Sequence, residues 1–326
     1  MNSRVLFFLF LITLIGFSCG DDDEDDLVTI PEADRTEQQV IDNDSILRYL
    51  ETHYINNSII TDNNSISFDE IMIFALPENE ELPNPDENTI LVDLVETFNT
   101  TYFDVEYEYY ILRLNQGGSD FSPNFSDKVR VSYEGRLMDD TIFDSSISPV
   151  DFDLTSTIAG WSRVLPEFNN AEDFIINSDG TVTYINPGIG LMFLPSGLGY
   201  FSAAAGTVPV YSNLIFKFKV FQSEENDHDF DNVPSHIEDI DGDLDLTNDD
   251  NDEDGFANFV DSDDDNDGVL SVDEDLEPDS DLTVDRDGDG DPTNDIGDGD
   301  PTNDDTDGDG IPNYLDPDDT ASRDDY

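Results

Sequence analysis

Three segments near the end of the chain carry carboxylates at alternate positions, a spacing that suits a hard cation. They read DNDEDGFANFVD (250–261), DDDNDGVLSVDE (263–274) and DTDGDGIPNYLD (305–316). Oxygen ligands at loop positions one, three, five, nine and twelve converge on one ion, and glycine at position six permits the sharp turn. We therefore expect structural calcium here, held by Asp250, Asp252, Asp254, Asp261, Asp263, Asp265, Asp267, Ser271, Glu274, Asp305, Asp307, Asp309, Asn313 and Asp316.

A disordered acidic tail is the alternative for this region, because residues 223–326 are rich in Asp, Asn and Gly and poor in apolar side chains. Because all three loops place oxygen ligands at the same loop positions, calcium binding is favoured over a disordered acidic tail. Near-duplicate DGDPTND units at 289–295 and 298–304 indicate a repeat origin. The region resembles thrombospondin type-3 calcium repeats. Without calcium, self-repulsion should leave it extended.

The overall composition excludes several classes of function. The chain of 326 residues has a formal net charge of −67, which argues against nucleic-acid binding because phosphate contacts need clustered Lys and Arg. One cysteine rules out an intramolecular disulfide framework. The three histidines, His53, His228 and His236, have no zinc-like spacing.

The first residues read as an export signal. Arg4 precedes the apolar run VLFFLFLITLIGF, which is too short to span a bilayer. The run ends in IGFSCG, residues 15–20, which resembles a lipobox and implies lipidation of Cys19. The acidic run 21–26 resembles the export signal of surface lipoproteins in Bacteroidetes-type bacteria. We therefore expect an outer-membrane lipoprotein that faces the cell surface or the periplasm and is held in the membrane by its lipid. An ordinary secretory signal with an incidental cysteine is the alternative.

The middle of the chain supplies the elements that would carry a binding site. The apolar spacing over 36–54 predicts a helix, with Thr36 and Gln39 at capping-box distance. Alternation predicts strands over 104–115, 127–137 and 213–221, and a hairpin over 173–186 with Asp179-Gly180 as a two-residue turn. Only AGWSRVLPEF, 159–168, reads as a short helix in this part, so we expect an α+β domain.

Five blocks then occur in the order and spacing of one known family. They are VRVSYEGRLMDDTIFDSS, FDL, TIAGW, LPSGLGY and VPVYSNLIFKFKV, within residues 105–222. This pattern resembles FKBP-type peptidyl-prolyl isomerases. The resemblance implies a bent antiparallel sheet wrapped around one short helix, with an apolar cleft that accepts a proline ring of a polypeptide partner. Carried over block by block, the lining residues are Tyr133, Phe143, Asp144, Phe152, Ile158, Trp161, Tyr200, Val208 and Phe216.

These residue types suit rotation about an X–Pro bond. Rotation is slow because amide resonance gives the C–N bond partial double-bond character. The resemblance makes Trp161 the floor of the cleft and Tyr200 a hydrogen-bond donor to the peptide. The carboxylate of Asp144 could complement the twisted carbonyl, and no catalytic cofactor is required. The alternatives are that Trp161 is ordinary core and that Asp144 caps a turn.

The sequence departs from the family pattern at several positions. Asp140 replaces a turn glycine, Phe201 replaces the glycine after Tyr200, and Val210 replaces a proline. Because the last two changes fall in the flap over the cleft, they bear on rate and peptide preference more than on the fold.

These observations divide the chain into five parts: 1–18 signal peptide, 19–35 lipidated tether, 36–100 accessory segment, 101–222 isomerase-like domain and 223–326 calcium-binding tail. We expect a lipoprotein that isomerises X–Pro bonds of exported or surface proteins. The alternatives are a non-catalytic module that binds proline-containing peptides and a structural surface protein dominated by its tail.

Overall fold

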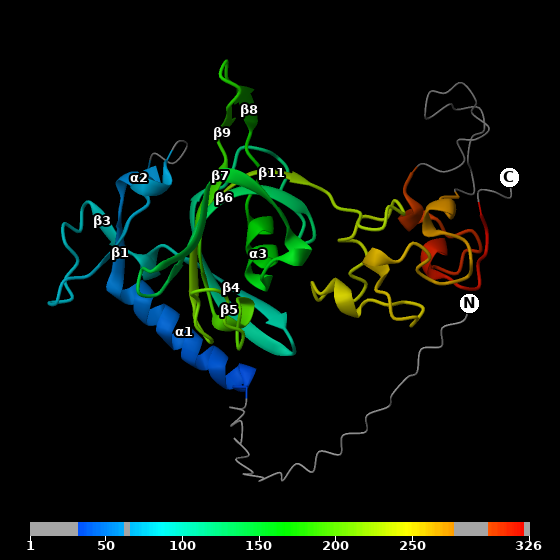
Figure 1. Ribbon diagram of the computed structural model, residues 1–326, viewed down its shortest axis with the longest axis horizontal. Helices are drawn as coiled ribbons and strands as arrows, with labels where there is room; N and C mark the ends of the chain where they lie inside the picture. The colour runs from blue at the N-terminus through cyan, green and yellow to red at the C-terminus, as the bar shows by residue number, and fades with distance from the viewer. Residues whose placement is uncertain (1–31, 62–65, 277–298, 323–326) are drawn as a thin grey trace, which may run out of the picture. The chain divides into compact units, whose positions relative to one another are not determined.

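A six-stranded antiparallel sheet forms the centre of the computed structural model, which describes residues 32–61, 66–276 and 299–322. The strand order is β4-β5-β10-β11-β6-β7, and the sheet curves around the short helix α3 (Figure 1). The described part of the chain is thus rich in sheet and has few helices, as the patterning predicted. The strands of this sheet are β4 (Glu96–Tyr102), β5 (Val105–Asn115), β6 (Lys128–Leu137), β7 (Ile142–Asp153), β10 (Gly188–Leu194) and β11 (Leu214–Glu224).

Alternate side chains of the sheet enter two different cores. On one face, Tyr109 and Ile111 of β5 pack with Phe216 and Phe218 of β11 around α3. On the other face, the intervening residues of the same strands pack against the N-terminal segment. Because both faces are covered, the central strand β10 is buried at every position and shows no polar alternation.

Helix α3 (Ala159–Val164) is only six residues long and continues into a 3-10 turn over Leu165–Glu167. It presents Trp161, Val164 and Leu165 to the first core. Gly160 permits its close approach to the sheet, because a Cβ there would lie 2.2 Å from Leu194 Cδ1. This helix corresponds to the segment that the sequence indicated.

The N-terminal helix α1 (Arg35–Thr52) covers the second face of the sheet. Its predicted cap was wrong: the N-cap is Asp34, whose side chain accepts a hydrogen bond from Glu37 N at 3.0 Å, rather than Thr36 with Gln39. A cap needs extended backbone, and Asp34 has it, whereas Thr36 already lies inside the helix.

The accessory segment holds a second, three-stranded sheet of order β2-β1-β3. Strand β4 begins at Glu96, so the central sheet starts before the boundary expected at residue 101. The sequence of β4, ETFNTTY, does alternate, but most of its side chains are polar, so the sequence does not stand out as a strand. The elements of this segment are β1 (His53–Asn56), α2 (Ser58–Thr61), β2 (Ile73–Ala75) and β3 (Asn88–Ile90).

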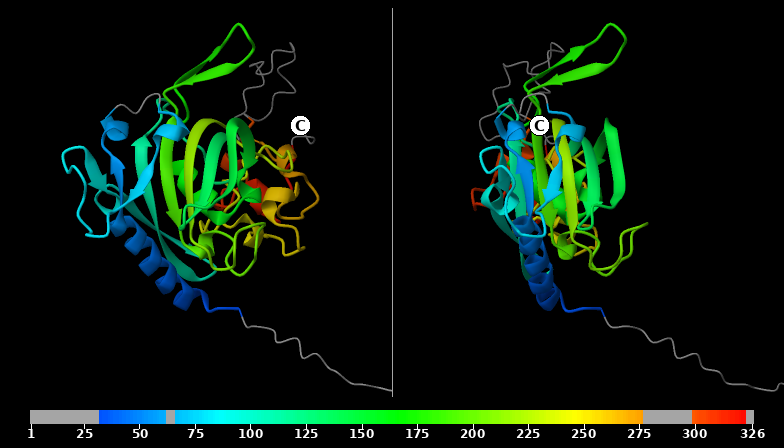
Figure 2. Two further views of the ribbon diagram at one scale, coloured as in Figure 1. Left: turned by 60° about the vertical axis from the view of Figure 1, so that its left-hand side comes forward. Right: turned by 90° about the vertical axis from the view of Figure 1, so that its left-hand side faces the viewer.

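A separate hairpin of β8 (Asp173–Ile176) and β9 (Val182–Ile185) projects from the central sheet (Figure 2). The hairpin was predicted, but its two-residue turn was wrong. Asn177 N donates to Thr181 O at 2.8 Å, which leaves a three-residue connection that ends in Gly180 at φ 85°. A left-handed glycine at the end of a three-residue loop is common in hairpins.

The described tail residues form loops joined by single 3-10 turns, such as Asn258–Val260 and Ser271–Asp273. No helix in the described residues is both long and apolar enough to cross a membrane. The predicted signal sequence, Cys19 and the unit 289–295 lie outside the described residues.

Candidate functional site

A cleft of about 380 Å³ opens between α3 and the strands β6, β7 and β11. Eight of the nine side chains expected to form a proline cleft line it. The lining also includes Ser156 and Thr157 from the turn before α3, which the sequence did not single out. The complete lining is Tyr133, Phe143, Asp144, Phe152, Ser156, Thr157, Ile158, Trp161, Tyr200 and Phe216.

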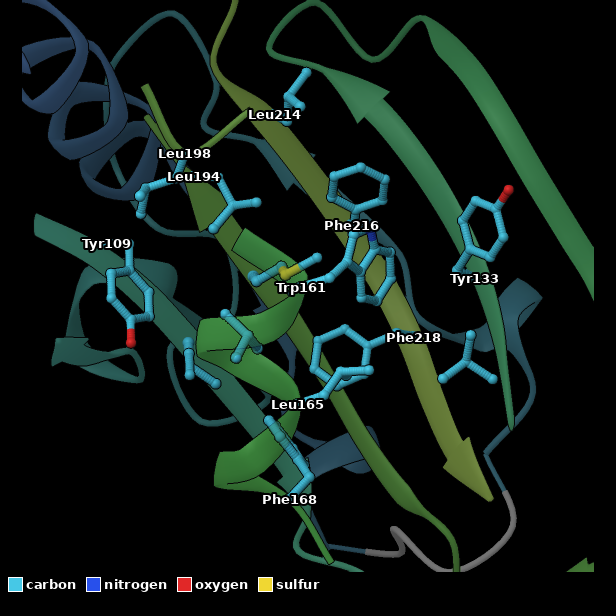
Figure 3. Packing of buried hydrophobic residues seen from close by; sticks show 14 of the residues in the cluster. Tyr109, Tyr133, Trp161, Leu165, Phe168, Leu194, Leu198, Leu214, Phe216 and Phe218 are labelled. Carbon is cyan, nitrogen blue, oxygen red and sulfur yellow. The ribbon is translucent and has the colours of Figure 1, made fainter. Parts of the chain in front are cut away.

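Trp161 lies at the centre of the aromatic cluster and is 4% exposed. Its ring centroid lies 4.9 Å from that of Phe216 and 5.6 Å from that of Phe152, and Tyr133 meets it edge-on at 5.8 Å. Figure 3 shows Trp161 reaching from α3 toward Phe216 on β11. Trp161 is therefore both a core residue and part of the cleft lining. The two roles expected for it from the sequence do not exclude each other.

The carboxylate of Asp144 is held at the exposed rim of the cleft by two hydrogen bonds. Tyr133 Oη donates to Asp144 Oδ2 at 2.7 Å, and Ser145 N donates to Asp144 Oδ1 at 2.8 Å. Burial, followed by the hydrogen bond to Asp144, raises the pKa of Tyr133, so the phenol keeps its proton and acts as the donor. The orientation of the carboxylate is thereby fixed before any peptide enters.

Tyr200 lines the cleft together with Asp144 and is half-buried. Burial and the charge of Asp144 raise its pKa, so its hydroxyl also stays protonated. Among the described residues, no hydrogen bond uses this hydroxyl, which leaves it as a donor for a ligand. Val208 does not line the cleft: it is 3% exposed and packs in the core cluster that contains Trp161.

Gly135 on β6 is a further requirement of the cleft wall. A Cβ at this position would lie 2.6 Å from Phe143 Cζ and 2.8 Å from Phe216 Cε1. Glycine therefore lets the two rings close edge to face over the strand, with centroids 5.4 Å apart. A glycine inside an otherwise alternating strand is the sequence signal for such a close approach.

The flap keeps a glycine-like backbone at Phe201 although the residue is bulky. Its φ is 46°, a left-handed conformation that costs a non-glycine residue free energy. Packing offsets this cost: the Arg35 guanidinium lies 4.0 Å above the Phe201 ring, and the Tyr211 ring meets it edge-on at 5.2 Å. Asp140, where the family pattern has a turn glycine, is also left-handed, with φ 67°.

Helix α1 braces both ends of the segment that carries the flap. The buried carboxylate of Asp42 accepts hydrogen bonds from Ser196 N at 2.9 Å and from Ser196 Oγ at 2.6 Å. The Asp42 carbonyl accepts from Asn213 Nδ2 at 3.0 Å. Ala33 N donates to Tyr211 Oη at 2.9 Å. The N-terminal segment therefore supports the part of the chain that carries Tyr200 and Phe201.

The three acidic loops of the tail share one pattern of closure. In each, the backbone N–H at position nine donates to the carbonyl before position one, as Asn258 N does to Asp249 O at 2.8 Å. The side chain at position nine accepts from the N–H at position two: Asn313 Oδ1 accepts from Thr306 N at 2.9 Å. Ser271 and Asn313, predicted as ligands, thus use their side-chain oxygens to close the loops.

Carboxylates at positions one, three and five are gathered in these loops. The ligand atoms of Asp250, Asp252 and Asp254 lie within 4.8 Å of one another, as do those of the corresponding trio in the next loop, Asp263, Asp265 and Asp267. Each of these two trios includes buried oxygens that no hydrogen bond satisfies. The loop 305–316 has the same Asx turns, with Gly310 N donating to Asp305 Oδ2 at 2.9 Å.

Glu274, at position twelve, is fully buried with neither carboxylate oxygen hydrogen-bonded. Burial, then the charge of Asp265, raises its pKa to about 9. A buried group of acids without partners is costly unless a cation joins it. The donor set therefore fits calcium. Asp261 and Asp316 occupy position twelve of the other two loops.

Residues 120–221 match the family model described as FKBP-type peptidyl-prolyl cis-trans isomerase. The chain is 35% identical over 115 residues to peptidyl-prolyl cis-trans isomerase Mip of Coxiella burnetii, which is 34% of this chain and 41% of the relative. It is 30% identical over 119 residues to FkpA of Aeromonas hydrophila, 36% of this chain and 38% of that one. The chain thus spans about two fifths of the length of these curated relatives.

Among solved structures, the chain is similar to a peptidyl-prolyl cis-trans isomerase from Pseudomonas syringae pv. tomato. The TM-score is 0.33 at 16% sequence identity, and the match covers 60% of this chain and 99% of that chain.

Proposed function

We propose that this protein isomerises X–Pro bonds in exported or surface polypeptides, since residues 120–221 match the family model described as FKBP-type peptidyl-prolyl cis-trans isomerase. The observation that carries the proposal is the aromatic cleft floored by Trp161, with the Tyr133–Asp144 hydrogen bond at its rim. The client polypeptides are proposed from the predicted export signal.

The cleft would act by favouring the twisted amide over the planar one. The barrier to rotation is about 18–20 kcal/mol and arises from amide resonance. A proline ring against Trp161, Phe216 and Phe152 leaves the preceding amide in an apolar site with little water. Water stabilises the polarised planar amide, so its removal lowers the cost of twisting. No covalent bond forms or breaks.

Two polar groups would orient the peptide in this process. Asp144, held by Tyr133 and Ser145, would present its carboxylate to the carbonyl carbon of the twisted amide, which becomes more positive as resonance is lost. The protonated Tyr200 hydroxyl would donate to a neighbouring peptide carbonyl. Because both groups are fixed before binding, little reorganisation is needed during rotation.

The test is a proline-isomerisation assay on Xaa-Pro model peptides. We expect the wild type to accelerate isomerisation and Asp144→Ala and Trp161→Ala to lose at least 10-fold in kcat/KM. Asp120→Ala is the matched control, since Asp120 is exposed and does not line the cleft. Binding of the peptide without acceleration would support the non-catalytic module instead, and neither binding nor acceleration would favour the structural protein.

We propose that the tail binds structural calcium through its three acidic loops. The support is the gathered carboxylates and the buried Glu274 without hydrogen-bond partners. Calcium titration of the full chain by calorimetry should release heat, and removal with a chelator should lower the melting temperature. If millimolar calcium gives neither heat nor a shift in melting temperature, the tail is simply acidic.

Attachment to the outer membrane through a lipid on Cys19 is also a proposal, supported by the lipobox-like IGFSCG and the acidic run after it. Mass spectrometry of the mature N-terminus after expression in a lipoprotein-processing bacterium tests it. We expect a diacylglycerol-modified Cys19 in the membrane fraction, and Cys19→Ser should move the protein out of that fraction. An unmodified mature chain in both variants would indicate an ordinary secretory signal.

A further inference from the structure

Residues 227–238, directly after β11, fold in the same way as the three predicted calcium loops. Ser235 N donates to Asn226 O at 2.9 Å, and Ser235 Oγ accepts from His228 N at 3.3 Å. These are the two closure bonds seen at position nine of the other loops. Asp227, Asp229 and Asp231 then occupy positions one, three and five, and their ligand atoms lie within 4.8 Å of one another.

Asn232 explains why the calcium-loop pattern does not reveal this segment. It stands at position six, where the other loops have glycine, and its φ is 74°. The glycines at that position, Gly255, Gly268 and Gly310, have φ of 98° to 101°. Asparagine tolerates the left-handed region better than other residues with a side chain, so the turn survives the replacement.

The burial of Glu238, at position twelve, indicates a ligand independently of this loop geometry. It is 0% exposed, and neither of its carboxylate oxygens has a hydrogen-bond partner. Asp231 is also 0% exposed, and its Oδ2 has no partner. Burial, followed by the charges of Asp229 and Asp264, raises the pKa of Glu238 to about 10. Such a group is unstable as a set of bare carboxylates.

Asp264 brings a further carboxylate from the neighbouring loop. It is 2% exposed, its Oδ1 has no hydrogen bond, and its ligand atom lies within 4.8 Å of those of Asp231 and Glu238. Among the described residues, no lysine or arginine forms an ion pair with these three acids, which leaves an external cation to balance them.

We propose that Asp229, Asp231, Glu238 and Asp264 form a fourth divalent-cation site, with calcium as the ion that their all-oxygen donor set selects. The site joins two loops that are separate in the sequence. It also lies beside the isomerase domain, because His228, within the same loop, bonds Asp153 Oδ2 through Nε2 at 3.2 Å. Asp153 ends β7, next to the turn that lines the cleft. Calcium would thus hold the tail against the domain.

The experiment compares the full chain with Glu238→Gln, Glu274→Gln and Glu253→Gln, using calcium chloride as the probe in calorimetry. Glu253 is exposed and occupies position four of its loop, so it is the matched control. We expect Glu238→Gln to lose one bound calcium per chain relative to wild type, Glu274→Gln to lose a different one, and Glu253→Gln to lose none.

Melting temperatures separate a ligand from a merely structural residue. In chelator, Glu238→Gln should melt no lower than wild type, because a neutral amide replaces a buried acid that has no hydrogen-bond partner. With calcium, its rise in melting temperature should be smaller. Unchanged calcium stoichiometry and affinity would overturn the site, as would an equal loss of stability with and without calcium. If the wild type binds calcium and only Glu274→Gln weakens it, this site fails while the calcium-binding tail stands.

Discussion

Tyr133 Oη and Asp144 Oδ2 lie 2.7 Å apart at the rim of the cleft, and they join neighbouring strands β6 and β7. The bond uses one oxygen of the carboxylate, and Ser145 N uses the other. Asp144 is thus oriented by its surroundings rather than by a ligand.

Tyr133→Phe should lower kcat/KM for an Xaa-Pro peptide by about 10-fold or more, since one hydrogen bond to a charged group is worth about 1.5–3 kcal/mol. The ring stays, so the apolar cleft is kept and the melting temperature should change little. Tyr109→Phe is the control, because its hydroxyl also donates a hydrogen bond, to Arg163 O, but outside the cleft lining. Equal losses in the two variants would contradict a role for the Asp144 contact.

At position 201, glycine should be more stable than alanine. Both Phe201→Gly and Phe201→Ala lose the packing against Arg35 and Tyr211. Only alanine keeps the cost of a left-handed backbone, about 1–2 kcal/mol, so urea unfolding should rank the glycine variant above the alanine variant. On the exposed helical residue Asp44 the order should reverse, by about 1 kcal/mol. If the alanine variant were the more stable one at position 201 as well as at position 44, the left-handed φ of 46° at Phe201 would carry no strain.

Asp42→Ala should destabilise the protein by about 2–3 kcal/mol, because Ser196 N and Oγ would be left buried without an acceptor. It should also raise KM for the peptide, since the loop that leads to Tyr200 loses its anchor on α1. Asp44→Ala, on the exposed side of the same helix, is the control for unfolding and for kinetics. If KM stays at the wild-type value while stability falls, α1 supports the fold without positioning the flap.

Asp127→Asn should stabilise the protein at pH 7 by roughly 1 kcal/mol. Burial, with Glu225 adding repulsion, raises the pKa of Asp127 from 3.8 to about 6. The folded state therefore holds this proton more tightly than the unfolded one, and stability is lost as the pH rises from about 4 to above 6. Chemical unfolding at pH 4 and pH 7 measures the effect, with exposed Asp120→Asn as control. An advantage for Asp127→Asn that is as large at pH 4 would contradict this origin.

The predictable part of the fold was the part in which polar and apolar side chains alternate along a strand or follow helix periodicity. Strands β5, β6 and β11 show enough alternation to be located from sequence. Strand β10, Gly188–Leu194, is apolar throughout because cores lie on both of its faces, so periodicity gives no signal. The strands β1 to β3, three or four residues each, are too short for any pattern to emerge.

The cleft was largely predictable because its residues sit in five ordered blocks. What the sequence could not show is how remote segments support it. The hydrogen bonds from Ser196 to Asp42 join positions 154 residues apart, and no local spacing indicates such a pair. Val208 was expected in the lining, but its side chain packs in the core cluster instead.

Asp264 has a consequence for the order in which the tail assembles. Its place in the chain is inside the loop 263–274, whose closure bond from Ser271 N to Ser262 O holds it in position, yet its ligand atom lies within 4.8 Å of those of Asp231 and Glu238. The site at 227–238 is therefore incomplete until the later loop has closed. Calcium would therefore fill the later loop before the earlier one, and residues 227–238 could complete their site against the neighbouring domain only once residues 263–274 were folded.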